Sequence, residues 1–264
     1  MNNKGIGVFD SGLGGLTVVK EIMDILPHER IIYLGDTART PYGSKTKETI
    51  IRFSKENTSF LLKNNVKIIV VACNTASALA LNEIKREFDI DIIGVIEAGA
   101  RAAVEESKNR RIGVIGTRAT IGSGAYEKAI KKYDKKAKVV SRATPLLVPL
   151  IEEGWLTDKE TESILKKYLE PFKKAKTDAL VLGCTHYPLI KTVIKKLLPG
   201  VTIIDSAREM AKTVRALLDA RGITAGTNNR KKSAFYVTDT PDTFNKIGKM
   251  FLKKDMIKAV KIEI

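Results

Sequence analysis

The sequence predicts an α/β protein with two similar domains, each built on a mostly parallel sheet flanked by helices. Short apolar runs rich in β-branched residues alternate with longer amphipathic stretches, a pattern typical of parallel strands joined by helices. Two patterns also occur twice: residues 66–77 (VKIIVVACNTAS) match residues 177–187 (TDALVLGCTHY), and residues 6–11 (IGVFDS) match residues 112–117 (IGVIGT).

The matching segments are separated by nearly equal distances along the chain. Ile112 follows Ile6 by 106 residues, and Cys184 follows Cys73 by 111 residues. Near-equal offsets indicate an internal duplication. We therefore expect a pseudo-twofold relation between the domains, with the active site in the cleft between them.

The elements of the first half follow in chain order. Apolar runs predict strands at Ile6–Phe9, Ile31–Leu34 and Ile68–Ala72. Amphipathic stretches predict helices at Gly15–Ile25, Lys45–Asn64 and Ala76–Phe88. The cycle restarts at residues 112–117, where the second domain is expected to begin its own sheet.

The end of the chain is expected to return to the first domain. Within Ser233–Ile264, a strand is predicted at Ala234–Val237, followed by a helix and a final short strand. The first domain then comprises residues 1–97 and 208–264 and carries Asp10 and Cys73. The second comprises residues 98–207 and carries Cys184. Short linkers are expected near Gly94–Gly99 and near Asp205–Arg208.

Composition narrows the class of protein. With 264 residues, 44% of them hydrophobic, each domain can bury a core, and no apolar run approaches the ~20 residues of a membrane helix. The formal net charge is +16, but many basic residues lie on the polar faces of predicted helices, without interleaved aromatic residues. This favours solvated surfaces and steering of small acidic substrates over nucleic-acid binding.

Cys73 and Cys184 are the two cysteines of the chain, and each follows a predicted strand. A buried free cysteine often acts as a small hydrophobe, but the carboxyl ends of parallel strands are where α/β sheets bind ligands. The sequence begins MNNKGIG without an apolar signal segment, so we expect a reducing, cytoplasmic compartment and no disulfide. Two Cys and two His without C-x-x-C spacing make a poor metal site, so no metal is expected.

The loop at residues 10–15 (DSGLGG) permits a different interpretation. It follows a strand and opens a helix, and Asp36 lies about where a dinucleotide fold places its ribose-binding acid. The third glycine of that fingerprint falls on Thr17, however, and the Asp10 carboxylate would repel a pyrophosphate. The loop therefore suits an ammonium group better than a dinucleotide.

Five motifs in order resemble glutamate racemases of the aspartate/glutamate racemase family. They are GVFDSGLGGLTV (7–18), GDTARTPYG (35–43), ACNTASA (72–78), VPLIEEG (148–154) and GCTHYP (183–188). The resemblance implies cofactor-independent interconversion of L- and D-glutamate, supplying D-glutamate for bacterial peptidoglycan. This chain departs from similar sequences at Thr144, where those sequences often carry cysteine.

The resemblance also implies roles for particular residues. Cys73 and Cys184 match the two proton donor/acceptor thiols, and the other expected catalytic residues are Asp10, His186, Asp36 and Glu152. The expected substrate-binding residues are Asp10, Ser11, Pro41, Tyr42, Gly43, Asn74, Thr75, Thr117, Thr185 and His186. The expected partners are the substrate glutamate and a second copy of the chain in a homodimer, with no nucleic acid and no membrane.

Inverting an α-carbon explains why two thiols are needed. One group must remove a proton from one face while a protonated group returns one to the other, and a thiol with an ordinary pKa of ~8.5 suits both roles. The helix starts after the two cysteines are expected to lower the thiol pKa values and to hold a carboxylate. Asp10 is assigned to the Cys73 side and His186 to the Cys184 side.

Two other functions remain open. One is a related racemase or isomerase with the same two-thiol cleft, such as one acting on aspartate. The other is a nucleic-acid or partner-binding protein that uses the +16 charge. A racemase assay across acidic amino acids distinguishes the first, and salt-dependent DNA binding that survives thiol substitution would favour the second.

Overall fold

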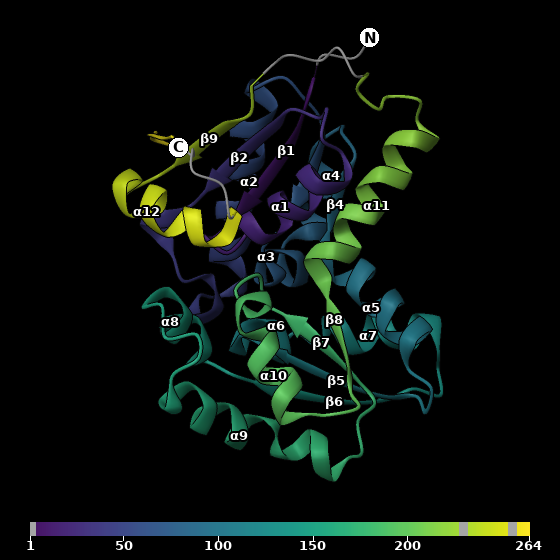
Figure 1. The fold of residues 1–264 in the computed structure, drawn as a ribbon. Helices are drawn as coiled ribbons and strands as arrows, with labels where there is room; N and C mark the ends of the chain where they lie inside the picture. Colours follow the sequence, from purple (N-terminus) through teal and green to yellow (C-terminus); the bar gives the residue numbers. More distant parts are fainter. Residues whose placement is uncertain (1–3, 227–231, 253–257) are drawn as a thin grey trace.

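The strands of the residues that the structure describes form two separate parallel sheets, one above the other in Figure 1. The computed structural model describes residues 4–226, 232–252 and 258–264. Sheet A has the order β10-β9-β2-β1-β3-β4 and sheet B the order β6-β5-β7-β8. All neighbouring strands are parallel. The predicted α/β fold class is therefore confirmed.

The strands of sheet A are β1 (Gly5–Asp10), β2 (Ile31–Gly35), β3 (Val66–Val71), β4 (Ile92–Gly94), β9 (Ala234–Val237) and β10 (Ala259–Lys261). Those of sheet B are β5 (Arg111–Gly116), β6 (Lys138–Ala143), β7 (Ala179–Gly183) and β8 (Thr202–Asp205). The order β2-β1-β3-β4 repeats as β6-β5-β7-β8, so the topology repeats as the sequence duplication predicts.

Helices cover both faces of each sheet (Figure 1). The helices of twelve residues or more are α2 (Lys47–Lys63), α5 (Val95–Glu106), α9 (Lys159–Lys174), α11 (Ser206–Ala220) and α12 (Pro241–Leu252). The shorter helices are α1 (Leu16–Ile25), α3 (Asn74–Leu79), α4 (Leu81–Glu87), α6 (Arg118–Gly122), α7 (Ala125–Tyr133), α8 (Leu147–Glu152) and α10 (Lys191–Leu197). Within the described ranges, 3₁₀ turns lie at Thr37–Arg39, Tyr42–Ser44 and Tyr187–Ile190.

Strand periodicity explains how each sheet is covered. Along β1, Ile6 and Val8 face a core with α1 and α11, while Phe9 faces the opposite core with α2 and α3. Because successive side chains of a strand point to opposite faces, a central strand with helices on both sides must be apolar throughout. This is why β1, β2 and β3 are buried along their whole length.

The two domains exchange helices where they meet. Helix α5 follows β4 of sheet A, yet Ile96, Ala100 and Ala103 pack in a core of sheet B. Helix α11 follows β8 of sheet B, yet Met210 and Val214 pack in the core of sheet A with α1. Each crossing is therefore a buried helix rather than a loop.

The predicted linkers are accordingly wrong. Gly94 ends β4, and α5 begins at Val95, so Gly94–Gly99 is a strand end followed by the first turn of a helix. Asp205 caps α11 by accepting a hydrogen bond from the Ala207 backbone N–H at 3.2 Å. Both segments form helices because their apolar side chains pack against a sheet, those of α5 against sheet B and those of α11 against sheet A. The exact boundaries at 97/98 and 207/208 stay a prediction.

One predicted helix is also wrong in its bounds. Instead of a single helix at Ala76–Phe88, α3 begins at Asn74 and α4 begins at Leu81, with a break at Ala80 (φ −117°). The earlier start makes Cys73 the residue that caps α3. The two short helices replace one amphipathic helix because Asn74, Thr75, Ala76 and Ser77 are all buried, so α3 lies inside the protein.

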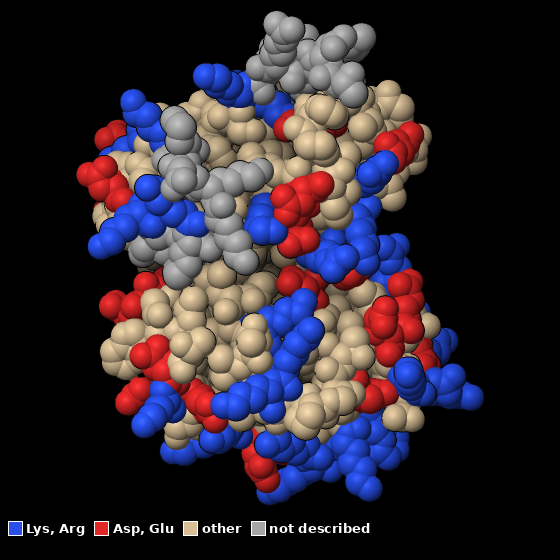
Figure 2. Space-filling model, viewed as in Figure 1, with Lys and Arg blue, Asp and Glu red and all other residues tan. Residues whose placement is uncertain are grey.

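The surface carries charges of both signs. Figure 2 shows Lys and Arg side chains on both domains, with Asp and Glu among them. Many form ion pairs one helical turn apart, such as Lys131 with Glu127 and Lys166 with Glu162. None of the helices in the described ranges is long and apolar enough to span a membrane.

Candidate active site

The carboxyl ends of both sheets meet at one small cavity, which we call the two-thiol cavity. Its volume is about 30 Å³. It is lined by Ser11, Thr40, Pro41, Tyr42, Gly43, Cys73, Asn74, Thr75, Thr117, Val148, Cys184, Thr185 and His186. Residues 11–75 of this set follow strands of sheet A, and the remainder follow strands of sheet B.

The two cysteines lie in the wall of this cavity. Cys73 follows β3, Cys184 follows β7, and both thiols are free. Their exposed fractions are 5% and 6%, so each is nearly removed from solvent. The internal duplication thus brings two equivalent thiols from different domains to the same space.

Cys73 is held as a protonated thiol. Burial, and after it the charge of the Asp10 carboxylate, raises the pKa of Cys73 to about 12. The Ala76 backbone N–H and the Ser11 side chain lower this pKa but do not offset burial. The expectation that the helix start would lower the thiol pKa is therefore wrong for Cys73, because α3 offers few donors against a fully desolvated sulfur.

Asp10 lies behind the cavity rather than in its lining. It is fully buried, and its Oδ2 accepts a hydrogen bond from the Gly12 backbone N–H at 3.1 Å. The Thr185 hydroxyl donates to Oδ1 at 3.5 Å, which links the two domains. Burial raises the pKa of Asp10, although the charge of His186 and the backbone N–H groups of its own loop lower it.

Cys184 is the first group of a three-residue chain. Its Sγ lies 3.7 Å from His186 Nδ1, and His186 Nε2 lies 3.0 Å from Glu152 Oε1. Burial lowers the pKa of His186, but Cys184 and Glu152 outweigh burial and raise it to about 10. His186 is therefore an imidazolium at neutral pH, with one N–H directed at the sulfur and the other at the carboxylate.

Asp36 acts at a distance from the cavity. It is fully buried and does not line the cavity, but its Oδ2 accepts a hydrogen bond from the Tyr42 hydroxyl. Arg39 Nε lies 2.7 Å from the same oxygen, and Thr238 donates to Oδ1 at 3.0 Å. Asp36 thus holds Tyr42, which does line the cavity, and does not face the reacting atoms.

The structure brings most of the predicted site residues together. Those that line the cavity are Ser11, Pro41, Tyr42, Gly43, Cys73, Asn74, Thr75, Thr117, Cys184, Thr185 and His186. Asp10, Asp36 and Glu152 do not line it. Thr40 and Val148 also line it, and neither was among the residues expected from the sequence. Both lie inside the motifs at 35–43 and 148–154, and Thr40 directly precedes the selected Pro41, so the motifs contained the signal.

A second cavity adjoins the first. Its volume is about 350 Å³, and it shares Thr40, Pro41, Gly43, Thr117 and Val148 with the two-thiol cavity. Glu152 lines this second cavity, so its carboxylate contacts His186 from outside the two-thiol cavity. Thr144 lines it too, with its hydroxyl 2.6 Å from Tyr187 Oη and 3.2 Å from the Gly116 carbonyl oxygen. The hydroxyl of Thr144, the residue at which this chain departs from similar sequences, is thus fully hydrogen-bonded.

Two glycines allow the domains to approach this closely. A Cβ on Gly14 would lie 2.2 Å from Thr185 Oγ1, and a Cβ on Gly43 would lie 2.7 Å from Thr117 Cβ. Both neighbours belong to the second domain. No side chain larger than hydrogen fits at either position, so these glycines are needed for the closed cavity.

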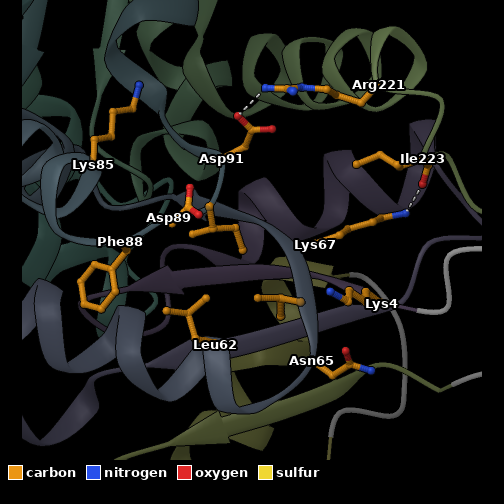
Figure 3. Close-up of a pocket in the computed structure, with 12 residues that line it drawn as sticks. Lys4, Leu62, Asn65, Lys67, Lys85, Phe88, Asp89, Asp91, Arg221 and Ile223 are labelled. Atoms are coloured by element: carbon orange, nitrogen blue, oxygen red, sulfur yellow. Dashed lines mark hydrogen bonds and ion pairs between the residues drawn. The ribbon is translucent and has the colours of Figure 1, made fainter.

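A much larger cavity lies at the other end of sheet A, where the strands begin (Figure 3). Its volume is about 670 Å³, and two of the charged groups that line it, Lys67 and Arg221, have partners. Lys67 pairs with Glu29 at 2.8 Å, and Arg221 pairs with Asp91 at 3.0 Å. It contains no cysteine or histidine. Nor, among the residues described, do three or more His, Cys, Asp or Glu side chains group so as to hold a metal ion.

Comparison with known proteins agrees with this geometry. The model of the Asp/Glu/hydantoin racemase family matches residues 11–214. A glutamate racemase from Geobacter metallireducens is 48% identical over 250 residues, covering 94% of this chain and 93% of that protein.

Solved structures are similar over the whole chain. A glutamate racemase isoform from Bacillus anthracis has a TM-score of 0.96 at 41% identity, covering 100% of this chain and 99% of that one. A glutamate racemase from Francisella tularensis, solved in complex with D-glutamate, has a TM-score of 0.93 at 42% identity, covering 100% and 98%. Similarity of this extent includes both domains.

Proposed function

The chain belongs to the Asp/Glu/hydantoin racemase family, and we propose that it interconverts L- and D-glutamate without a cofactor, through the thiols of Cys73 and Cys184. One observation carries the proposal: two buried free thiols, one from each domain, line the same small cavity. A racemase needs a proton acceptor on one face of the α-carbon and a proton donor on the other. Two thiols on separate domains can supply both.

The reaction moves one proton at each face. The thiolate of one cysteine removes the α-proton, its sulfur becoming S–H, and the electron pair left on carbon is delocalised into the α-carboxylate. The other cysteine then donates its S–H proton to the opposite face and becomes a thiolate. By family resemblance, Cys184 is the base for L-glutamate and Cys73 the base for D-glutamate. No electron acceptor is needed, because nothing is oxidised or reduced.

The resting electrostatics favour one of these two states. The pKa of Cys73, raised to about 12 by burial, keeps its proton in place. Next to Cys184, the His186 imidazolium at 3.7 Å stabilises negative charge on the sulfur. The protonated Cys73 is the acid that returns a proton when Cys184 acts as the base, which is the direction that converts L-glutamate.

Burial of the site reduces the barrier for a weakly acidic α-hydrogen. Both thiols are almost completely desolvated, so fixed donors around the cavity act on developing charge without competition from water. The hydroxyls of Thr75, Thr117 and Thr185 and the amide of Asn74 surround the space where a carboxylate would lie. These groups can stabilise the negative charge that proton removal transfers to that carboxylate.

The direct test is a circular-dichroism assay of purified protein with L-glutamate in deuterated water and no added cofactor. We expect the signal to decay to zero as the racemate forms. The D-glutamate formed early should carry deuterium at the α-carbon, while unreacted L-glutamate stays mostly protiated. Product that keeps the original hydrogen would instead indicate one base on one face. Loss of activity with hydroxylamine would contradict the absence of a carbonyl cofactor.

The same assay with L-aspartate tests the main alternative. Turnover of aspartate at a rate equal to or above that of glutamate would assign a different acidic amino acid as substrate. The proposal further includes a supply of D-glutamate for peptidoglycan, a cytoplasmic compartment and a homodimer, of which the first and last follow from the family resemblance. Binding to DNA is not part of the proposal.

A further inference from the structure

Asn74 has an unused hydrogen-bond donor in the wall of the two-thiol cavity. The residue is 3% exposed and lies between Cys73 and Thr75. Its Nδ2 has no hydrogen-bond partner among the described residues. A buried polar group without a partner is costly, so a donor left open beside a cavity indicates a group that a ligand would satisfy.

The other end of the same amide is bound from the second domain. Tyr126, in the first turn of α7, donates its hydroxyl hydrogen to Asn74 Oδ1 at 2.7 Å. Tyr126 is itself 2% exposed. Burial raises the pKa of its phenol, so the hydroxyl stays protonated and remains a donor throughout the neutral range.

Close packing leaves the Tyr126 ring little freedom. A Cβ on Gly183 would lie 3.1 Å from the ring, and a Cβ on Gly99 would lie 3.4 Å from the ring and from its hydroxyl. Gly183 directly precedes Cys184, and Gly99 belongs to the crossing helix α5. The hydroxyl is thus held at one point relative to both domains.

We propose that Tyr126 is a positioning residue that fixes the orientation of the Asn74 amide, so that the NH₂ group faces the substrate and donates to its carboxylate. A flipped amide would direct Oδ1 into the cavity, where it would repel a carboxylate, and the phenol would lose Oδ1 as its acceptor. The proposal rests on the proposed function, because it takes an acidic amino acid as the ligand.

The first test is Tyr126→Phe, with Tyr133→Phe as the matched control on the same helix. Tyr133 is 42% exposed and lies outside the cavity. Loss of one donor to a charged group predicts a roughly ten- to hundredfold lower kcat/KM for both enantiomers in Tyr126→Phe. The control should stay within about twofold of the wild type. A Tyr126→Phe variant that is folded and as active as the wild type would overturn the proposal.

A double-mutant cycle separates positioning from general packing. If the phenol acts through Asn74, then Tyr126→Phe should cost little more in the Asn74→Ala background. Additive losses would show that Tyr126 acts independently of Asn74. Where residual turnover is too slow, the same cycle can be measured as the Kd of D-glutamate in the Cys73→Ser protein.

A measurement on the wild-type chain covers the case in which Tyr126→Phe does not fold. The Asn74 side-chain NH₂ signals, assigned by comparison with Asn74→Ala, should shift and exchange more slowly with water when D-glutamate is added. No response of these signals, while other cavity residues respond, would overturn the proposal. Failure of the proposed function looks different, since the wild-type protein would then neither racemise nor bind glutamate.

Discussion

At the scale of single residues, the two thiols differ in what surrounds them. Cys73 has the buried carboxylate of Asp10 for a neighbour, whereas Cys184 has a protonated imidazole backed by Glu152. The same residue type is thus prepared for opposite tasks by its environment. This asymmetry suits a reaction in which one thiol must start protonated and the other deprotonated.

Replacing either thiol tests whether both are needed. Cys73→Ala or Cys184→Ala should each lower kcat/KM at least ~10²-fold in both directions, because either change removes the acid or base from one face. The far-UV circular dichroism should be unchanged, since each substitution removes a single buried sulfur. Near-normal turnover of both enantiomers by either variant would disprove the two-thiol mechanism.

The raised pKa of His186 predicts a pH dependence of stability. In the unfolded chain a histidine titrates near its ordinary pKa of 6.5, whereas the folded pKa is about 10. The folded protein binds the proton more tightly, so the contribution of His186 is complete below pH 6.5 and is lost as the pH rises towards 10.

Urea unfolding of wild type and His186→Gln between pH 6.5 and pH 9 measures this contribution. The wild-type free energy of unfolding should fall more steeply with pH than that of the variant. Cys73 is present in both proteins, so its own loss of stability, which begins near the ordinary thiol pKa of ~8.5 of the unfolded chain, cancels from the difference between the two curves. Parallel curves for the two proteins would show that His186 is not held as an imidazolium.

At the scale of elements, a buried ion pair holds the segment that follows α11 against the first domain. Lys67 at the start of β3 and Glu29 before β2 pair at 2.8 Å, and each side chain is 2% exposed. Lys67 also donates to the Ile223 carbonyl oxygen at 2.6 Å, and Glu29 accepts from the Ala225 backbone N–H at 2.7 Å. The pair therefore fastens the segment after α11 to sheet A, and Figure 3 shows the contact of Lys67 with Ile223.

Breaking this pair should be costly although it is far from the cavity. Lys67→Met leaves the Glu29 carboxylate buried without its cation, and we expect about 3–5 kcal/mol of lost stability from urea unfolding. Lys67→Met with Glu29→Gln should recover most of it, since the amide stays an acceptor for Ala225 without a charge. Lys20→Met, which removes an exposed pair with Asp24, serves as the control and should cost less than about 1 kcal/mol. A loss in Lys67→Met no larger than that of the control would contradict a structural role.

At the scale of the whole molecule, the site exists only where the domains touch. The crossing helices α5 and α11 each leave one sheet and pack on the other, so the domains are joined through their cores as well as through the chain. One close approach of the two domains beside the cavity is between Gly43 and Thr117. The volume of the cavity therefore depends on how closely the domains meet.

Adding one methyl group at this contact tests that dependence. In Gly43→Ala, the new Cβ would lie 2.7 Å from Thr117 Cβ, so the domains must separate or the backbone must shift. An overpacking cost of about 1–3 kcal/mol on the closed state would lower kcat/KM roughly ten- to hundredfold. Gly122→Ala is the control, because no atom lies within 4 Å of its added Cβ. Equal kcat/KM in the two variants would mean that closure at Gly43 does not limit the reaction.

Much of the fold and of the candidate site could be predicted from the sequence. The strands at Ile6–Phe9 and Ile68–Ala72 were located to within two residues at each end, because buried central strands are continuous apolar runs. The two-domain α/β fold followed from the repeat of strand, small residue and cysteine. The motifs around Cys73 and Cys184 contained most of the residues that line the cavity.

Other properties were decided only by tertiary structure. Residues 94–99 and 205–208 were predicted to be linkers, yet buried helices begin there. Each of these helices packs its apolar side chains on the sheet of the other domain. The helix start after Cys73 predicted a lowered pKa, but complete desolvation of the sulfur reverses it. Asp36 and Glu152 turn out to hold Tyr42 and His186 rather than to line the cavity.

The sequence by itself determined the sheets, their duplication and the two thiols, because these depend on local apolar patterns and on residue identity. The tertiary structure decided the crossing of α5 and α11, the raised pKa values of Cys73 and His186, and the contact of Tyr126 with Asn74. These depend on burial and on distances between residues far apart in the chain. Neither quantity exists before the two domains pack together.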